Sequence, residues 1–270
     1  MIESDAMAII DFHTHAFPDS LAARAIAALE AEADHVWKAK LDGRVSSLLA
    51  SMDAAGVDRS VVCPIATKPQ QFDGILQWCL AIRSERIVPL ASVHPEAEDL
   101  VRQIGRVADA GLAGIKLHPM YQDFDADDRR LDVLYSTVAA AGLLLVLHCG
   151  HDIAYPGSLQ AHPDRIAAII DRHPTLKLVA THLGGFKAWD LVRKHLVGKD
   201  VWMETSFTLG WMEPVEAMDI IRRHGPDRCL FGTDSPWADQ AEEIARLRAL
   251  PLTEAEKAAI LGGNAERVLG

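Results

Sequence analysis

Two histidines separated by one residue follow a short apolar run near the start of the chain, in Ala8-Ile9-Ile10-Asp11-Phe12-His13-Thr14-His15. Side chains alternate between the two faces of a strand, so His13 and His15 are expected to point the same way. Two neighbouring imidazoles supply half of the ligands of a typical divalent metal site. The remaining ligands are therefore sought at the ends of the other apolar runs.

Three further side chains of the required kinds come directly after apolar runs: His148 after 143–147, His182 after 178–181 and Asp234 after 230–233. In a parallel barrel, the carboxyl ends of the strands meet at one face, where active sites form. Three imidazole nitrogens and a carboxylate oxygen suit one Zn²⁺, with Mn²⁺ as the alternative. The expected ligands are His13, His15, His148 and Asp234. His182 is expected either to bind a second metal or to act beside the first as a general acid or base.

Lys116 and His118 share one face of the predicted strand Gly114-Ile115-Lys116-Leu117-His118 and are expected to point into the barrel mouth. A buried lysine is costly unless it is paired or modified. Lys116 would either remain cationic and hold a substrate carboxylate or oxyanion, or be carboxylated by CO₂ and bridge two metals. Both alternatives stay open at this stage.

Asp234 is expected to accept the proton of a water molecule near the metal and later to return it to a leaving group. The competing interpretation is that Asp234 caps the helix that follows Ser235-Pro236. Three residues are expected to contact the substrate: His118, His151 and Trp237. The segments 121–128 and 152–161 are expected to form much of the pocket rim.

Apolar runs and amphipathic segments alternate along the whole chain. The runs lie near 8–13, 59–63, 87–93, 113–118, 143–148, 176–181, 200–205 and 228–232. They lack polar alternation, as strands do when both faces of a parallel sheet are covered. Eight such units predict an α/β fold with a closed (β/α)8 TIM barrel as a single domain over 1–270, and a doubly wound sheet is the alternative. Histidines in the helical segments, such as His224, are expected at the surface.

The composition narrows the class of protein further. Apolar residues make up 49% of the chain, and the net charge of −11 comes without any block of Lys and Arg. We therefore expect a small-molecule substrate, no nucleic-acid partner and no membrane partner, and a homo-oligomer stays open. The four cysteines are scattered and are expected to be reduced and buried, which with the lack of a signal peptide predicts a cytoplasmic protein.

These motifs together resemble the amidohydrolase superfamily, and more closely its second branch, which includes aminocarboxymuconate-semialdehyde decarboxylase. The resemblance runs from Asp11-Phe12-His13-Thr14-His15 through Thr181-His182-Leu183-Gly184-Gly185 and Phe231-Gly232-Thr233-Asp234 to Gly263-Asn264-Ala265-Glu266-Arg267. It implies one catalytic metal on His13, His15, His148 and Asp234, with His182 beside it. Lys116 takes the position at which binuclear relatives carry a carboxylated lysine, so a second metal on Lys116 and His182 stays open.

The resemblance implies a metal-dependent hydrolase that activates water for attack on a lactone, amide or ester carbonyl, with His182 and Lys116 stabilising the oxyanion. The alternative is a metal-dependent, non-oxidative decarboxylase of an aromatic or muconate-like acid, because the branch contains both chemistries. The remote alternative is a metal-binding barrel without activity.

Overall fold

Eight short strands form where the chain carries uninterrupted apolar runs. The structure is a computed structural model and describes residues 8–270. Each strand overlaps one of the predicted runs, and nearly every strand residue is buried, because helices cover the outside and side chains fill the inside. The strands are β1 (Ile10–Thr14), β2 (Arg59–Val62), β3 (Ile87–Pro89), β4 (Gly114–Leu117), β5 (Leu144–Leu147), β6 (Lys177–Ala180), β7 (Trp202–Glu204) and β8 (Cys229–Leu230).

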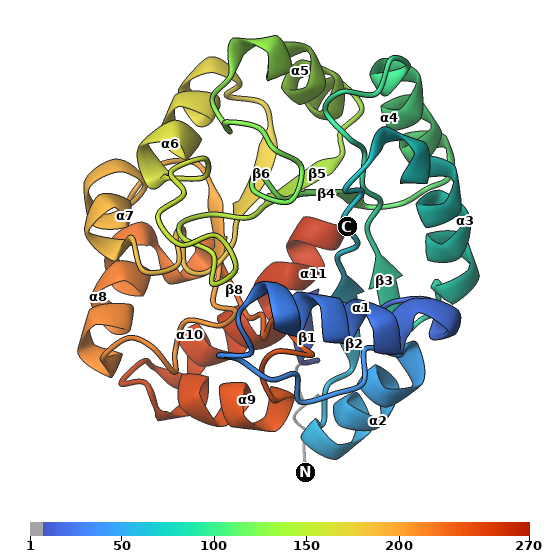
Figure 1. Ribbon diagram of the computed structural model, residues 1–270. Helices are drawn as coiled ribbons and strands as arrows, with labels where there is room; N and C mark the ends of the chain where they lie inside the picture. The colour runs from blue at the N-terminus through green and yellow to red at the C-terminus, as the bar shows by residue number, and fades with distance from the viewer. Residues whose placement is uncertain (1–7) are drawn as a thin grey trace.

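Helices follow the strands, and most of them form an outer ring around the strands (Figure 1). The last helical segment begins at a capping box, in which Thr253 and Glu256 each accept a backbone N–H of the other. The helices are α1 (Asp19–Glu32), α2 (Val45–Ala55), α3 (Phe72–Ile82), α4 (Leu100–Asp109), α5 (Asp132–Ala140), α6 (Pro163–Arg172), α7 (Trp189–His195), α8 (Pro214–His224), α9 (Gln240–Ala249), α10 (Glu254–Ala258) and α11 (Asn264–Leu269).

The strands pair in parallel in sequence order and close on themselves. Parallel ladders join β1 to β2 and β2 to β3, and a second set joins β4, β5, β6, β7 and β8, each to the next in that order. The first gap is closed by the bridge between Ala91 and Ile115, just after β3. The second is closed where Phe12 N–H donates to the Phe231 carbonyl at 2.8 Å. The fold is therefore the predicted (β/α)8 barrel, and the doubly wound alternative is wrong.

The core has two layers, one on each side of the barrel wall. Outward-facing strand residues such as Leu145 and Leu178 pack against the helices. Inward-facing residues such as Phe12 and Val146 fill the interior together with Ala265 of α11. Figure 1 shows α11 within the ring of strands, where it covers the amino-terminal end of the barrel. The closed interior leaves the carboxyl-terminal mouth as the open end.

Two residues at or near the carboxyl ends of helices, Gly56 and His224, take positions set by the local backbone. Gly56 ends α2 with φ +72°, the left-handed conformation that glycine adopts without a Cβ penalty. The surface position expected for His224 is wrong: its side chain is 2% exposed and hydrogen-bonds the Val201 carbonyl, because α8 turns this residue toward the barrel.

Among residues 8–270, no helix combines the length and the hydropathy that crossing a bilayer requires.

Candidate metal centre

His13 and His15 lie at the carboxyl end of β1 and face the same carboxylate. Asp234 Oδ1 lies 3.0 Å from His15 Nε2 and 3.6 Å from His13 Nε2. Between Asp11 and Thr14, β1 advances three residues while β2 advances two, from Ser60 to Val62, so β1 carries one extra residue there. This bulge occurs at the rim of the barrel, where it re-aims side chains into the mouth.

The other ring nitrogen of each histidine is already occupied. His13 Nδ1–H donates to Glu204 Oε1 and to Ser206 Oγ, both at 3.0 Å, and His15 Nδ1–H donates to the Cys63 carbonyl at 2.8 Å. Hydrogen bonds of this kind fix the tautomer of a metal-binding histidine and leave Nε2 with its lone pair. Burial, reinforced by the nearby charge of Lys116, lowers the pKa of His13 to about 4, so its imidazole is neutral at pH 7.

Asp234 follows β8 and bends back over the end of β1. Its backbone has φ +68°, and its N–H donates to the His13 carbonyl at 2.8 Å. Burial alone would raise the pKa of Asp234, but the imidazoles of His13 and His15 beside it hold that pKa well below its usual range. The alternative role as a helix cap is wrong, because Asp239 accepts the Glu242 N–H at the start of α9.

Lys116 projects from β4 into the centre of this group. Its side chain is fully buried, and its Nζ lies 3.1 Å from His13 Nε2. Burial of an ammonium group costs desolvation free energy, which is offset only when the group has hydrogen-bonding or charged partners. His13 Nε2 supplies a lone pair, and the carboxylates of Glu204 and Asp234 lie on either side of the same imidazole. Lys116 therefore points into the barrel mouth, as the strand pattern predicts.

His182 and His148 are hydrogen-bonded to each other. His182 Nδ1–H donates to the Ser206 carbonyl at 3.0 Å, so its Nε2 accepts from His148 Nδ1 at 3.1 Å. The other nitrogen of His148 lies 3.2 Å from the His151 carbonyl. His148 therefore stands beside His182 and not among the His13, His15 and Asp234 ligand atoms. Its expected role as a ligand of the same metal stays a prediction.

The residues expected to contact the substrate all line one cavity at the mouth: His118, His151 and Trp237. His118 is stacked on His148 with ring centroids 4.0 Å apart, and its Nε2 lies 3.3 Å from Asp152 Oδ2. Burial, with Lys116 nearby, lowers the pKa of His118 well below its usual range. His118 and His148 thus form, with Asp152, a second group whose ligand atoms lie within 4.8 Å of one another.

The donor set at the end of β1 fits a divalent metal ion. His13, His15 and Asp234 each offer a ligand atom, all within 4.8 Å of one another. Because both Nδ1 atoms are used as donors, two nitrogen lone pairs face one carboxylate. The Lys116 ammonium group meets only the His13 lone pair, whereas a divalent cation would meet both lone pairs and the carboxylate at once. Two imidazoles and a carboxylate match the ligands of Zn²⁺ and Mn²⁺ sites that keep a coordination position open.

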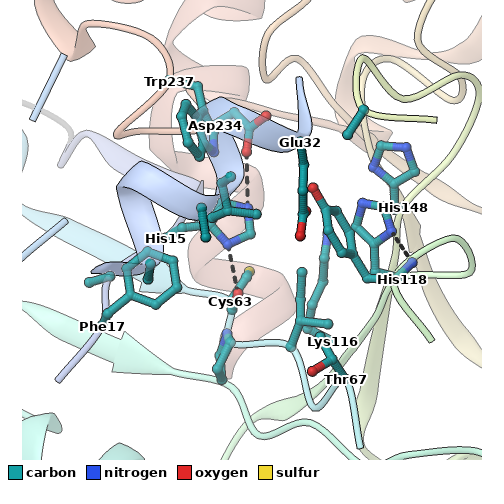
Figure 2. Close-up of a pocket in the computed structure, with 18 of the residues that line it drawn as sticks. His15, Phe17, Glu32, Cys63, Thr67, Lys116, His118, His148, Asp234 and Trp237 are labelled. Atoms are coloured by element: carbon teal, nitrogen blue, oxygen red, sulfur yellow. Dashed lines mark hydrogen bonds and ion pairs between the residues drawn. The ribbon is translucent and has the colours of Figure 1, made fainter. Parts of the chain in front are cut away.

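The cavity above this centre has a volume of about 850 Å³. Figure 2 shows His15 and Asp234 on one side of it and His118 and His148 on the other, with Glu32 of α1 reaching in between them. Four aromatic rings pack together, and all but Trp211 line the cavity: Trp37, Phe186, Phe207 and Trp211. The reactive groups therefore open into a large and mainly apolar space.

Sequence reasoning missed the carboxylate that organises the centre. Glu204 ends β7, is fully buried, and accepts the His182 N–H at 2.9 Å and the Ser206 N–H at 2.6 Å besides His13. Burial alone would raise the pKa of Glu204, but His13 and the surrounding donors lower it to about 2. The sequence does contain a pattern that could have identified Glu204, because it is an ionisable residue near the carboxyl end of the apolar run 200–205.

A closed (β/α)8 barrel with a cluster of histidines and carboxylates at its carboxyl-terminal mouth is typical of barrel enzymes, which form their active sites at that face. The family model described as amidohydrolase matches residues 10–270, and the chain is therefore a member of the amidohydrolase family. This confirms the resemblance inferred from the motifs. No match was found among curated protein sequences.

Solved structures of similar fold cover almost the whole chain. An uncharacterised TIM-barrel protein of Bordetella bronchiseptica is 21% identical, with a TM-score of 0.77 over 97% of this chain and 98% of that one. The 5-carboxyvanillate decarboxylase of Sphingomonas paucimobilis is 20% identical, with a TM-score of 0.70 over 97% and 99%. The dihydroxybenzoic acid decarboxylase of Polaromonas sp. JS666, solved with bound manganese, is 16% identical, with a TM-score of 0.71 over 97% and 96%. All three share the barrel fold with this chain.

Proposed function

We propose that this protein is a metal-dependent, non-oxidative decarboxylase of an aromatic or similarly unsaturated acid. The observation that carries the proposal is the cluster of His13, His15 and Asp234 around a site for one divalent ion, at the floor of an apolar cavity in a member of the amidohydrolase family. The decarboxylases of Sphingomonas and Polaromonas described above support the reaction class.

The cofactor in this proposal is one Mn²⁺ or Zn²⁺ held by His13 Nε2, His15 Nε2 and Asp234, with His148 as a further ligand after a change of its ring position. When bound, the ion would supply Lewis acidity that orients the substrate's carboxylate and a neighbouring oxygen. Manganese is favoured because two decarboxylases of similar fold, from Polaromonas and from Novosphingobium aromaticivorans, were solved with bound manganese. The sequence alone favoured zinc.

The chain's own residues would move one proton. Decarboxylation converts R–COO⁻ and a proton into R–H and CO₂: the C–C bond breaks, its electron pair stays on the carbon, and a new C–H bond forms there. Asp234, which is ionised before substrate binds, would take this proton from solvent once an anionic substrate beside it raises its pKa, and would then pass the proton to the carbon. Lys116 would bind the substrate's negative charge, and His182, held by Ser206 and His148, would orient it.

Hydrolysis, the main expectation from the sequence, becomes the second candidate. It is favoured by the ionised state of Asp234, since a carboxylate can take a proton from water. Decarboxylation is the better supported of the two because of the structural relatives. A metal-binding barrel without activity has no observation in its favour.

The test is a panel of hydroxybenzoic acids and of lactones, amides and esters, each offered to protein loaded with Mn²⁺ or Zn²⁺. We expect CO₂ to appear in equal amounts to the acid consumed, and the rate to fall at least 100-fold in Asp234→Asn. Release of an alcohol, amine or hydroxy acid without CO₂ would establish hydrolysis instead. Metal-loaded protein that turns over neither group of compounds contradicts both candidates.

A further inference from the structure

Helix α1 presents an apolar face to the cavity and not to the barrel wall. Of its 14 residues, all of which the structure describes, only Ala22 is buried. The residues that line the cavity follow the spacing of one helix face: Leu21, Ala25, Ala28, Leu29 and Glu32. An amphipathic helix normally buries this face against the core. Here the face looks onto the same space as the metal centre.

The space beneath α1 is walled on its other side by apolar residues of the segment from β2 to α3. Pro64, Ile65, Ile75 and Trp78 belong to the lining. Ala25 and Ala28 are small, so the centre of the helix leaves room where larger side chains would fill the gap. Since His13 and Asp234 line the same cavity, an occupant of this space would be continuous with a substrate at the metal centre.

Helix α1 is tied down at both ends, which keeps this space open. At its start, Phe17 N–H donates to the Gly43 carbonyl at 2.8 Å. At its end, Glu32 faces Tyr121 across the cavity that both residues line. Beyond it, Trp37 Nε1–H donates to the Trp237 carbonyl at 2.8 Å. These ties hold the helix across the mouth without letting it collapse onto the barrel.

The cavity is much larger than a single-ring acid needs. A cavity of roughly 150 Å³ is enough to hold benzene, whereas this one measures about 850 Å³. Cavities of roughly 300–1,000 Å³ hold drug-sized ligands and bury most of their surface. A one-ring acid at the metal centre would therefore leave the space under α1 filled only with water, against apolar walls.

We propose that the substrate is an acid that carries an extended apolar group, and that this group lies in a tail subsite between α1 (Leu21, Ala25, Ala28, Leu29) and the β2–α3 segment (Pro64, Ile65, Ile75, Trp78). The proposal rests on the proposed function for the position of the acid group, at Lys116 and the metal ligands. The residues that face this space from α1 and from the β2–α3 segment are apolar, so an uncharged tail fits and an anionic one does not.

The test compares two ligands with the same head group on Mn²⁺-loaded protein, by calorimetry: 2-hydroxybenzoate and 4-hexyl-2-hydroxybenzoate. Each methylene buried contributes about 0.8 kcal/mol, or roughly fourfold in affinity. We expect the hexyl compound to bind at least 30-fold more tightly, since that requires burial of only about three methylenes. A gain of less than threefold overturns the proposal.

Matched variants of α1 show whether the gain arises in this subsite. Ala28→Trp fills the space, whereas Ala27→Trp places the same side chain on the exposed side of the helix, outside the lining. We expect the affinity ratio of the two ligands to fall to within threefold of unity in Ala28→Trp and to persist in Ala27→Trp. Ala25→Leu is the second filling variant, and thermal melting checks the fold of each. A ratio unchanged in both filling variants contradicts the subsite.

Failure of the subsite and failure of the proposed function give different results. If the hexyl compound binds tightly, and loses this gain in Ala28→Trp, while no acid releases CO₂, the subsite stands and decarboxylation fails. If CO₂ is released from the one-ring acid and the hexyl group adds no affinity, the function stands and the subsite fails.

Discussion

Glu204 offers the most informative perturbation of the metal centre, because a change of one atom removes its charge and keeps its shape. The carboxylate accepts four hydrogen bonds: from His13 Nδ1 at 3.0 Å, from the His182 N–H at 2.9 Å, from Ser206 Oγ at 2.8 Å and from the Ser206 N–H at 2.6 Å. The first three use Oε1 and the last uses Oε2. In Glu204→Gln, the side-chain NH₂ group takes the place of one of the two oxygens. It must therefore face either the three donors that bind Oε1 or the single donor that binds Oε2.

The lower-cost choice places the amide oxygen toward His13 and the NH₂ toward the Ser206 N–H. One buried donor then loses its acceptor, which costs about 1–3 kcal/mol of folding free energy. The His13 N–H now donates to a neutral oxygen, so Nε2 becomes a poorer ligand. Changes to outer hydrogen-bond partners typically weaken metal binding by roughly 10–100-fold, or about 1.4–2.7 kcal/mol. We expect a loss in this range for Mn²⁺.

The assay is competition for Mn²⁺ with a chelator of known affinity, followed by calorimetry. Glu243→Gln is the matched control, because Glu243 is also a buried carboxylate but lies on α9, outside the cavity lining. We expect Glu243→Gln to bind Mn²⁺ as the wild-type protein does. If Glu204→Gln is folded and keeps wild-type affinity while His13→Ala loses the metal, the tautomer argument is refuted.

Three further outcomes follow from the structure. Burial raises the pKa of Glu243 to about 7 although Arg246 lies beside it, so its contribution to stability is present below pH 4.5 and is lost as the pH rises through 7. The free energy of unfolding of Glu243→Gln should therefore rise by up to about 3 kcal/mol relative to that of the wild type between pH 4.5 and 8, as measured by urea unfolding. An equal difference between variant and wild type at both pH values contradicts this. His15→Ala removes a proposed ligand and should lower the affinity for the metal by more than the roughly 10–100-fold loss typical of an outer partner. The metal content per chain, measured by plasma mass spectrometry, should therefore fall in His15→Ala, whereas His195→Ala on α7 should retain the wild-type metal content. Gly262→Ala places a Cβ against the Ala8 carbonyl and should destabilise by about 1–3 kcal/mol or more, whereas Gly105→Ala in α4 has open space and should be neutral or stabilising; unfolding midpoints that show no difference between the two refute the close contact.

The sequence was most informative where a side chain's place depends on its own strand. Strands buried on both faces need unbroken apolar runs, so the eight runs predicted the eight strands and the barrel. Residues that end such runs had to gather at the mouth, so chain order alone placed Lys116, His182 and Asp234 near His13 and His15. The family resemblance reached the same fold by its motifs.

The sequence was least informative about contacts between elements. It indicated that Glu204 ends a run, but not that its carboxylate would meet His13 from the opposite side of the barrel. It placed the pocket rim in 121–128 and 152–161, and it did not show that α1 also lines the cavity. Helical periodicity identifies an apolar face, and it does not tell what that face covers.

By itself, then, the sequence determined the barrel, the side of it that carries chemistry, and the types of residues gathered there, because these follow from strand periodicity and chain order. The tertiary structure decided which nitrogen of each histidine is free, that His148 lies with His182 and not with the His13 and His15 pair, and how large the cavity is. Those properties depend on distances of a few ångströms between residues up to 200 positions apart in the chain. Packing of whole elements sets such distances, and no local pattern contains them.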